Sequence, residues 1–237
     1  MKKFLFFDLD GTLLPMDRQE FEEAYFSRMI RFIAPHGYDP HALKNAILAS
    51  TVKMAENRSE ATNEQIFWQT ATQMLGDRIR EDGPLFEDFY ETDFQQIAAL
   101  CPANPDIQKL IEDLKGKYRL VLATNPLFPK IATHSRIRWA GLEPEDFELI
   151  TTYETCTRTK PDPAYFEEVL AKVGARPEEV IMIGNDTAED LTARQAGIEV
   201  FLLTDCLINP DDLSLDDIPH GSVNELRDWL EKRSPAA

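Results

Sequence analysis

The chain has 237 residues, of which 43% are hydrophobic and 28% charged, a balance typical of folded domains rather than fibrous or disordered chains. Its 25 Lys and Arg against 42 Asp and Glu give a net charge of −17, which opposes binding to nucleic acid or to an anionic membrane surface. No uncharged apolar stretch approaches the roughly 20 residues of a bilayer span. These features exclude most nucleic-acid-binding and membrane classes.

The N-terminus and the cysteines predict a cytoplasmic location. The first apolar run, Phe4–Phe7, ends at Asp8 and is too short for the core of a secretory signal. The cysteines at 101, 156 and 206 are too far apart for a Cys-x-x-Cys metal or redox pair. We expect all three to be reduced thiols.

The segment after the first run, from about residue 17 to residue 100, contains no convincing strand. Its apolar residues recur at helical spacing in four stretches, which begin near Phe21, Asp39, Asn63 and Phe86. Four amphipathic helices suffice for a small bundle with its own core. Prolines interrupt the pattern near residues 15 and 102, so we predict an inserted all-helical domain at 16–100 and a second domain at 1–15 and 101–237.

The rest of the chain alternates between short apolar runs and capped helices. Three further runs resemble the first, at residues 120–123, 180–183 and 200–203. Helical patterns start at Asn104-Pro105, at Asp162-Pro163 and near Thr187, and each ends at a glycine. Continuous apolar runs are typical of strands buried on both faces. The alternation predicts an α/β fold with a parallel sheet flanked by helices.

Two acidic pairs follow predicted strands. Asp8 and Asp10 come directly after the first run, where side chains two residues apart lie on the same side at roughly 6–7 Å. Such carboxylates repel each other, so we expect a divalent cation, Mg²⁺, beside them. Asp186 and Asp190 follow the run at 180–183, and helix capping alone would also explain them. Ligands of open parallel sheets gather beyond the carboxyl ends of strands, which favours one shared acidic site.

Three further candidate site residues are expected at the same edge of the sheet as the two acidic pairs. Thr124 and Asn125 close the run at 120–123, where a hydroxyl and backbone N–H groups could bind phosphoryl oxygens. Lys160 precedes Pro161 at the start of a predicted helix and could hold an anion there. Each has an ordinary structural explanation when taken alone, so their order along the chain carries the argument.

In order, Asp8-x-Asp10-Gly11-Thr12, Thr124, Lys160-Pro161 and Gly184-Asn185-Asp186-x-x-x-Asp190 resemble the four motifs of the haloacid dehalogenase superfamily. The resemblance covers nearly the whole chain and implies a Rossmann-like catalytic core with the helical segment as its cap domain. It further implies a Mg²⁺-dependent phosphatase that hydrolyses a small phosphorylated metabolite through an aspartyl-phosphate.

The resemblance also implies a role for each motif residue. Asp8 would be the nucleophile and Asp10 the general acid and base. Thr124 and Lys160 would hold the phosphoryl oxygens, with Asn125 beside them. Asp8, the backbone carbonyl of Asp10, and Asp186 would hold Mg²⁺, with Asn185 and Asp190 steadying these ligands.

The chain departs from many relatives in the last motif. The metal-binding Asp commonly follows the glycine directly, whereas here Asn185 stands in that place and Asp186 comes next. We take Asp186 as the ligand because a carboxylate binds Mg²⁺ better than an amide, and Asn185 is the alternative. Haloacid dehalogenases themselves lack the second aspartate of the first motif, so Asp10 argues against halide displacement.

Other functions on the same fold stay open at this point. A phosphomutase would return the phosphoryl group to a sugar, and a phosphonatase would need a cap lysine, for which only Lys44 and Lys53 are available. A catalytically idle binding protein is a third alternative. Arg58, in a polar stretch of the cap, is a candidate for reading a second anionic group on the substrate. The sequence leaves the substrate and the oligomeric state open.

Overall fold

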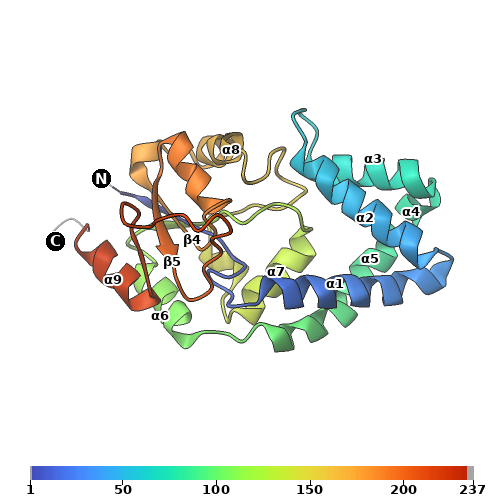
Figure 1. Ribbon diagram of the computed structural model, residues 1–237, viewed down its shortest axis with the longest axis horizontal. Helices are drawn as coiled ribbons and strands as arrows, with labels where there is room; N and C mark the ends of the chain where they lie inside the picture. The colour runs from blue at the N-terminus through green and yellow to red at the C-terminus, as the bar shows by residue number, and fades with distance from the viewer. Residues whose placement is uncertain (1, 234–237) are drawn as a thin grey trace.

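The computed structural model describes residues 2–233 and contains a six-stranded parallel sheet in the order β3-β2-β1-β4-β5-β6 (Figure 1). The strands are β1 (Phe4–Phe7), β2 (Arg119–Leu122), β3 (Leu149–Ile150), β4 (Val180–Gly184), β5 (Glu199–Leu203) and β6 (His220–Gly221). The parallel α/β fold is therefore confirmed. The four predicted runs correspond to β1, β2, β4 and β5, whereas β3 and β6 have only two residues each and leave no apolar pattern.

The central strand β1 is buried on both faces. Leu5 and Phe7 belong to one hydrophobic cluster, with α6 (Pro105–Leu114), α7 (Lys130–Trp139) and α9 (Val223–Glu231). Phe4 and Phe6 belong to a second cluster on the opposite face, with α8 (Pro163–Val173) and the 3₁₀ helix η5 (Asp190–Ala196). Because helices cover both faces, every position of the strand is apolar.

The helix boundaries follow their capping residues. Asn104 caps α6 and Asp162 caps α8, each with a proline at the first helical position. The helix predicted after Thr187 is instead the 3₁₀ helix η5, which ends at Gly197 as expected. Short 3₁₀ turns also precede two strands, η3 (Pro144–Asp146) and η4 (Pro177–Glu179).

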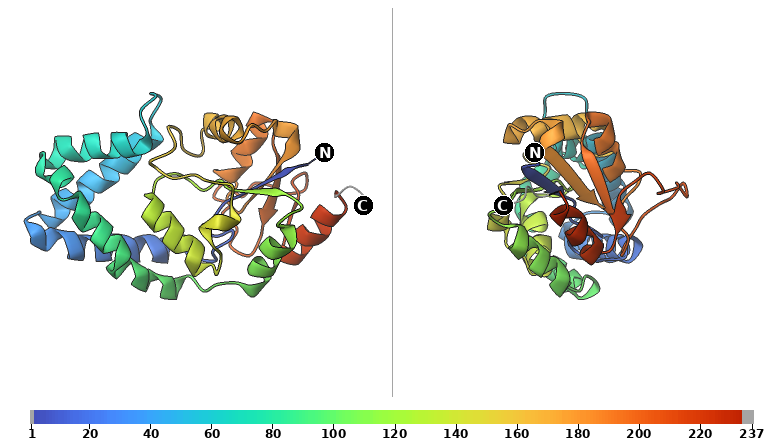
Figure 2. Two further views of the ribbon diagram at one scale, coloured as in Figure 1. Left: turned by 180° about the vertical axis from the view of Figure 1, so that it is seen from behind. Right: turned by 90° about the vertical axis from the view of Figure 1, so that its left-hand side faces the viewer.

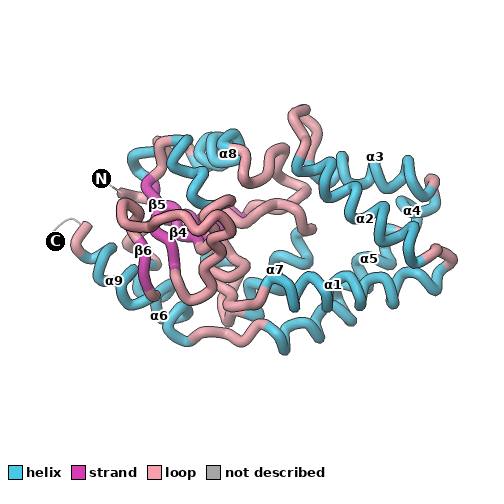
Figure 3. The backbone as a smooth tube through the Cα atoms, in the orientation of Figure 1, coloured by secondary structure: helices cyan, strands magenta, loops and turns pink. Residues whose placement is uncertain are grey.

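Residues 16–100, which we call the helical insertion, lie at the end of the molecule away from both termini (Figure 1). They contain helices and no strand among their described residues, and the strands gather in the other half (Figure 3). The elements are α1 (Arg18–Ile33), η1 (Ala34–His36), α2 (Pro40–Ala55), α3 (Asn63–Leu75), α4 (Arg78–Glu81), α5 (Gly83–Glu91) and η2 (Asp93–Leu100). Among the described residues, every helix is too short or too polar to span a bilayer.

The fourth predicted helix of the insertion was wrong in one respect. The apolar pattern from Phe86 to Ile97 reads as one helix, but the structure divides it into α5 and the 3₁₀ helix η2. Thr92 separates them with φ −120° and ψ −84°, and its hydroxyl donates to the carbonyl of Asp88. The aromatic positions remain buried because η2 turns the same apolar side toward α1 and α5.

The insertion and the sheet share one hydrophobic cluster. Phe94 of η2 packs on Trp139 of α7 with ring centroids 4.8 Å apart, and Phe21 of α1 lies 6.2 Å from Phe128. Seen from behind, η2 and α7 run beside each other between the two halves (Figure 2). These contacts place the first turn of α1 next to the carboxyl end of β1.

Candidate active site

The predicted site residues meet beyond the carboxyl ends of β1, β2 and β4. Asp8 and Asp10 follow β1, Thr124 and Asn125 follow β2, and Asn185, Asp186 and Asp190 follow β4. All seven line one cavity of about 780 Å³. The strands are adjacent and parallel, so their ends lie at the same edge of the sheet.

Lys160 lies beside this cavity and joins two of its carboxylates. Its Nζ is 2.7 Å from Oδ1 of Asp8 and 2.6 Å from Oδ1 of Asp190, and the residue is 2% exposed. Burial alone would lower the pKa of Lys160, but the two carboxylates raise it well above its ordinary value. Burial raises the pKa of Asp8 to about 8, although the Lys160 ammonium opposes that change.

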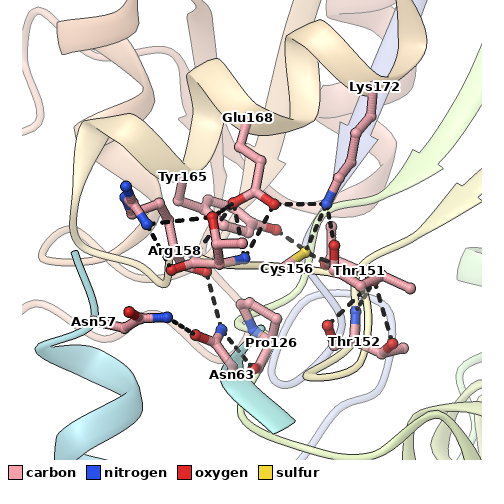
Figure 4. Close-up of polar contacts among 12 residues, drawn as sticks. Asn57, Asn63, Pro126, Thr151, Thr152, Cys156, Arg158, Tyr165, Glu168 and Lys172 are labelled. Atoms are coloured by element: carbon pink, nitrogen blue, oxygen red, sulfur yellow. Dashed lines mark hydrogen bonds and ion pairs between the residues drawn. The ribbon is translucent and has the colours of Figure 1, made fainter. Parts of the chain in front are cut away.

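The segment before Lys160 is held by Glu168 of α8. The carboxylate of Glu168 accepts hydrogen bonds from the backbone N–H groups of Thr157 and Arg158 at 3.0–3.1 Å, and from Nζ of Lys172 at 2.7 Å (Figure 4). Cys156 is buried in the same region, and burial raises the pKa of its thiol. This network fixes the backbone from which Lys160 reaches the carboxylates.

Asp190 supports the turn after β4. Its Oδ2 accepts from the backbone N–H groups of Asn185 at 2.9 Å and Asp186 at 3.0 Å. A Cβ at Gly184 would lie 2.2 Å from the same oxygen, so only glycine permits this approach. Asp190 thus positions both the turn and Lys160.

Asn185 connects the ends of β1 and β4. Its Oδ1 accepts from the Thr12 hydroxyl at 2.8 Å, and its Nδ2 donates to the carbonyl of Cys206 at 2.7 Å. Gly11 has φ +84°, and a Cβ there would lie 2.3 Å from Nδ2 of Asn185. Both polar atoms of the amide are therefore engaged in holding the turns together, which suits an orienting residue.

Asp186 presents its carboxylate at the cavity edge. Its Oδ1 accepts from the backbone N–H groups of Ala188 at 2.7 Å and Glu189 at 3.0 Å. Its Oδ2 lies 3.4 Å from a guanidinium nitrogen of Arg18, whose side chain is 55% exposed. This contact brings the first residue of α1 to the site, a role that the sequence did not indicate.

The donor set at this edge fits a hard cation. The carboxylates of Asp8 and Asp186 and the backbone at Asp10 offer oxygen ligands, which Mg²⁺ prefers. A cation would also favour the ionised form of the buried Asp8 carboxyl. In the described part of the chain, no group of three His, Cys, Asp or Glu side chains is arranged as a metal site. The Mg²⁺ ligands expected here include only two such side chains, those of Asp8 and Asp186, because the third ligand is a backbone carbonyl.

Asp10 has a partner that sequence reasoning missed. The guanidinium of Arg136, on α7, contacts Oδ2 of Asp10, and the Arg136 side chain is fully buried. The guanidinium carbon also lies 4.2 Å from the centroid of the Phe128 ring. Oδ1 of Asp10 is buried with no hydrogen-bond partner among the described residues. Arg136 follows a helical pattern in the sequence, and nothing in that pattern distinguishes it from a solvated arginine.

Asn125 is also tied into the site. Its Nδ2 donates to Oε2 of Glu189 at 2.9 Å, and its Oδ1 is buried without a partner in the described chain. Burial raises the pKa of Glu189. Nδ2 also donates to the carbonyl of Lys160 at 3.4 Å, so the Asn125 side chain holds Glu189 and the Lys160 segment and offers no free donor to a phosphoryl oxygen.

Arg58 is not brought to the cavity. Its side chain is 60% exposed, and a guanidinium nitrogen lies 3.1 Å from Oδ2 of Asp162 at the start of α8. It is absent from the described residues that line the cavity. The ion pair with Asp162 joins the insertion to residues 2–15 and 101–233, which carry the sheet and which we call the sheet domain. The Arg58 guanidinium is thus already paired and offers no charge to a second anionic group of the substrate.

Asn63, at the start of α3, forms a second connection between the insertion and the sheet domain. Its Nδ2 donates to the carbonyls of Pro126 at 3.3 Å and Arg158 at 3.2 Å, and its Oδ1 accepts from Asn57 (Figure 4). Asn63 is fully buried. The two carbonyls belong to the segments that carry Asn125 and Lys160, so this side chain fixes the insertion against the site.

The family model for haloacid dehalogenase-like hydrolases matches residues 2–197. The chain therefore belongs to the haloacid dehalogenase-like hydrolase family, and it is a hydrolase. The predicted family is confirmed.

Two curated relatives illustrate the similarity. The pyrophosphatase PpaX of Oceanobacillus iheyensis is 22% identical over 200 residues, which cover 82% of this chain and 80% of that protein. The glyceraldehyde 3-phosphate phosphatase of Methanothermobacter thermautotrophicus is 32% identical over 107 residues. That match spans 44% of this chain and only 46% of the relative's length.

Solved structures share the fold over nearly the whole chain. A HAD phosphatase from Thermococcus onnurineus aligns with a TM-score of 0.58 and 18% identity, covering 97% of this chain and 98% of that one. A 2-haloacid dehalogenase from Pseudomonas syringae pv. Tomato aligns with a TM-score of 0.61 and 20% identity, covering 98% and 100%. At these identities the likeness establishes the fold, and the chemistry has to come from the site.

Proposed function

We propose that the protein is a Mg²⁺-dependent phosphatase that hydrolyses a phosphomonoester through an aspartyl-phosphate on Asp8. The observation that carries the proposal is the arrangement of Asp8, Lys160 and Asp190 beside Asp10 and Thr124 at one cavity. The relatives named as a glyceraldehyde 3-phosphate phosphatase and a pyrophosphatase support hydrolysis at phosphorus.

In the first step, an oxygen of Asp8 attacks phosphorus and forms a new P–O bond as the bond to the leaving oxygen breaks. The carboxyl of Asp10 gives its proton to the departing alkoxide. The Lys160 ammonium offsets the negative charge that develops on the phosphoryl oxygens, and the Thr124 hydroxyl donates a hydrogen bond to one of them. The products of this step are the free alcohol and the aspartyl-phosphate.

In the second step, water attacks the phosphorus of the aspartyl-phosphate, and the carboxylate of Asp10 takes its proton. The P–O bond to Asp8 breaks, which returns the Asp8 carboxylate and releases inorganic phosphate.

Asp8, the carbonyl of Asp10, and Asp186 would hold Mg²⁺. When bound, the metal supplies positive charge that offsets the negative charge of the phosphoryl oxygens.

Two alternatives on this fold find less support. A phosphonatase would need a lysine of the insertion at the cavity, and neither Lys44 nor Lys53 lines it. Lys53 instead pairs with Glu56 at 2.7 Å on the exposed side of α2. A dehalogenase needs no general acid, whereas here Asp10 is held at the site by Arg136. A phosphomutase stays an outcome of the experiment below.

The test is phosphate release from p-nitrophenyl phosphate and a panel of alkyl phosphates, with Mg²⁺ and with a chelator. The wild-type protein should release phosphate only with the metal, and Asp8→Asn should reduce the rate at least about 10³-fold. The conservative variant Asp106→Asn, on the exposed start of α6, is the control. Transfer to an added sugar phosphate without phosphate release would identify a mutase, and activity retained in Asp8→Asn would refute the proposal.

A further inference from the structure

The cavity at the carboxylates is much larger than a phosphoryl group requires. Its volume is about 780 Å³, whereas an engineered cavity of about 150 Å³ takes benzene. It extends from Asp8 and Asp10 along α1 to residues of α2, α3 and α5 in the insertion. The leaving group of the substrate would occupy this second part, because the phosphoryl group must contact Asp8.

The insertion end of the cavity is lined mainly by apolar and aromatic side chains. Phe26, Phe67, Trp68 and Phe86 contribute rings, and Ile47 and Leu48 of α2 contribute aliphatic groups. Trp68 packs edge-on against both Phe67 and Phe86, with centroids 5.3 and 5.4 Å apart. Such rings favour a flat aromatic ligand in an offset-stacked or edge-to-face geometry.

The same part of the cavity offers little to a polar or charged leaving group. Arg18 is the only Lys or Arg among the described lining residues, and it already contacts Asp186, Glu189 and Glu22. The hydroxyls of Tyr25 and Tyr90 are hydrogen-bonded to each other at 2.9 Å. A second phosphate or a carboxylate would therefore lose hydration without gaining an unpaired cation, and a sugar would place most of its hydroxyls against apolar side chains.

From these observations we infer that the substrate is a phosphomonoester of an apolar alcohol that carries an aromatic ring. This inference rests on the proposed phosphatase function and specifies its substrate class. Discrimination by an apolar pocket is about 10- to 200-fold for each methylene group, so several buried carbons give a large preference.

The first experiment compares primary alkyl phosphates, whose leaving alkoxides have similar basicity. The set contains 2-(1-naphthyl)ethyl phosphate, n-octyl phosphate, ethyl phosphate, glycerol 3-phosphate and glucose 6-phosphate, with p-nitrophenyl phosphate as a general probe. We expect kcat/KM for the naphthyl ester to exceed those of ethyl and glucose phosphates at least about 100-fold. It should also exceed that of the octyl ester.

Each other outcome has a distinct meaning. Equal or faster turnover of glucose 6-phosphate or glycerol 3-phosphate would overturn the inference and leave the phosphatase function intact. Faster turnover of the octyl ester would overturn the aromatic part of the inference. No release from any ester, including p-nitrophenyl phosphate, would overturn the proposed function itself.

A matched pair of variants on α2 tests the location of the leaving group. Leu48 is 39% exposed and lines the cavity, whereas Val52, one turn later, is 54% exposed and does not. Leu48→Glu should reduce the ratio of naphthyl to ethyl kcat/KM at least about tenfold, and Val52→Glu should leave that ratio within twofold. The same ratio in both variants would refute this placement.

A binding measurement separates recognition from catalysis. Calorimetric titration of the metal-free protein with 2-(1-naphthyl)ethanol, the product alcohol, should show binding that Leu48→Glu weakens at least about tenfold and Val52→Glu does not. No binding to the wild-type protein would overturn the inference, even where phosphate release is observed.

Discussion

Arg136 and Asp10 form an ion pair between α7 and the turn after β1, with the arginine fully buried and the aspartate side chain 31% exposed. The pair connects a helix of the sheet domain to the residue that we assign as general acid and base. Phe128 covers the guanidinium on one side, so the arginine has little freedom to move. We infer that Arg136 is a positioning residue that sets the direction of the Asp10 carboxyl.

Arg136→Met should therefore act mainly on esters whose leaving group needs a proton. For ethyl phosphate we expect kcat to fall about 10²-fold or more, because general acid catalysis contributes about 10²- to 10⁴-fold. For p-nitrophenyl phosphate, whose phenolate leaves without a proton, the loss should stay below tenfold. Steady-state kinetics on both substrates measures the difference.

Arg138→Met is the control for that experiment. Arg138 lies two residues further along α7, is 54% exposed and pairs loosely with Glu143 at 3.7 Å. It should behave as wild type with both substrates. Equal losses for both substrates in Arg136→Met would contradict the positioning role of Arg136.

Lys160→Met should destabilise the fold as well as abolish activity. The ammonium lies between Asp8 and Asp190, and removal of one partner from a buried ion pair costs about 3–5 kcal/mol. The double variant Lys160→Met/Asp190→Asn removes one of the two unpaired carboxylates, so it should be more stable than the single variant. Urea unfolding of the four proteins in this cycle gives the coupling, and strictly additive losses would contradict the pairing.

Gly11→Ala should reduce stability by about 1–3 kcal/mol, because the residue adopts φ +84° and its new Cβ would meet the amide of Asn185. Gly174→Ala is the matched control. Gly174 has φ +65° and a Cβ there would meet nothing within 4 Å, so that variant should lose only the cost of the left-handed conformation, about 1 kcal/mol. Thermal unfolding compares them, and equal melting temperatures would count against the turn geometry described above.

Asn63→Ala should loosen the attachment of the insertion. Two backbone carbonyls, of Pro126 and Arg158, would lose their donor, at a cost of about 1–3 kcal/mol. We expect a higher KM and faster limited proteolysis within residues 16–100. Gln73→Ala, an exposed position on the same helix, should change neither. Unchanged proteolysis in Asn63→Ala would contradict this prediction and would show that the ring contacts to α7 and Phe128 alone hold the insertion in place.

The sequence predicted those helices and strands whose buried positions form a regular pattern of apolar residues along the chain. The run Phe4–Phe7 is apolar at every position because helices cover both faces of β1, and the acidic residues after β1 and β4 meet because those strands are parallel neighbours. The break at Thr92 was missed because the apolar positions continue through α5 and η2 in the same register. Arg136 was missed because its partner Asp10 lies 126 residues away along the chain, and because no periodic pattern shows that the Phe128 ring covers its guanidinium.

The first turn of α1 limits where the insertion could be exchanged for that of a relative. Arg18 is its first helical residue, and it already contacts Asp186 and Glu189 across the site. A graft that begins at Arg18 would thus replace a residue that contacts the site carboxylates, along with the residues that line the substrate pocket. A chimera intended to change specificity alone should keep this chain through Glu22 and begin the foreign segment after it.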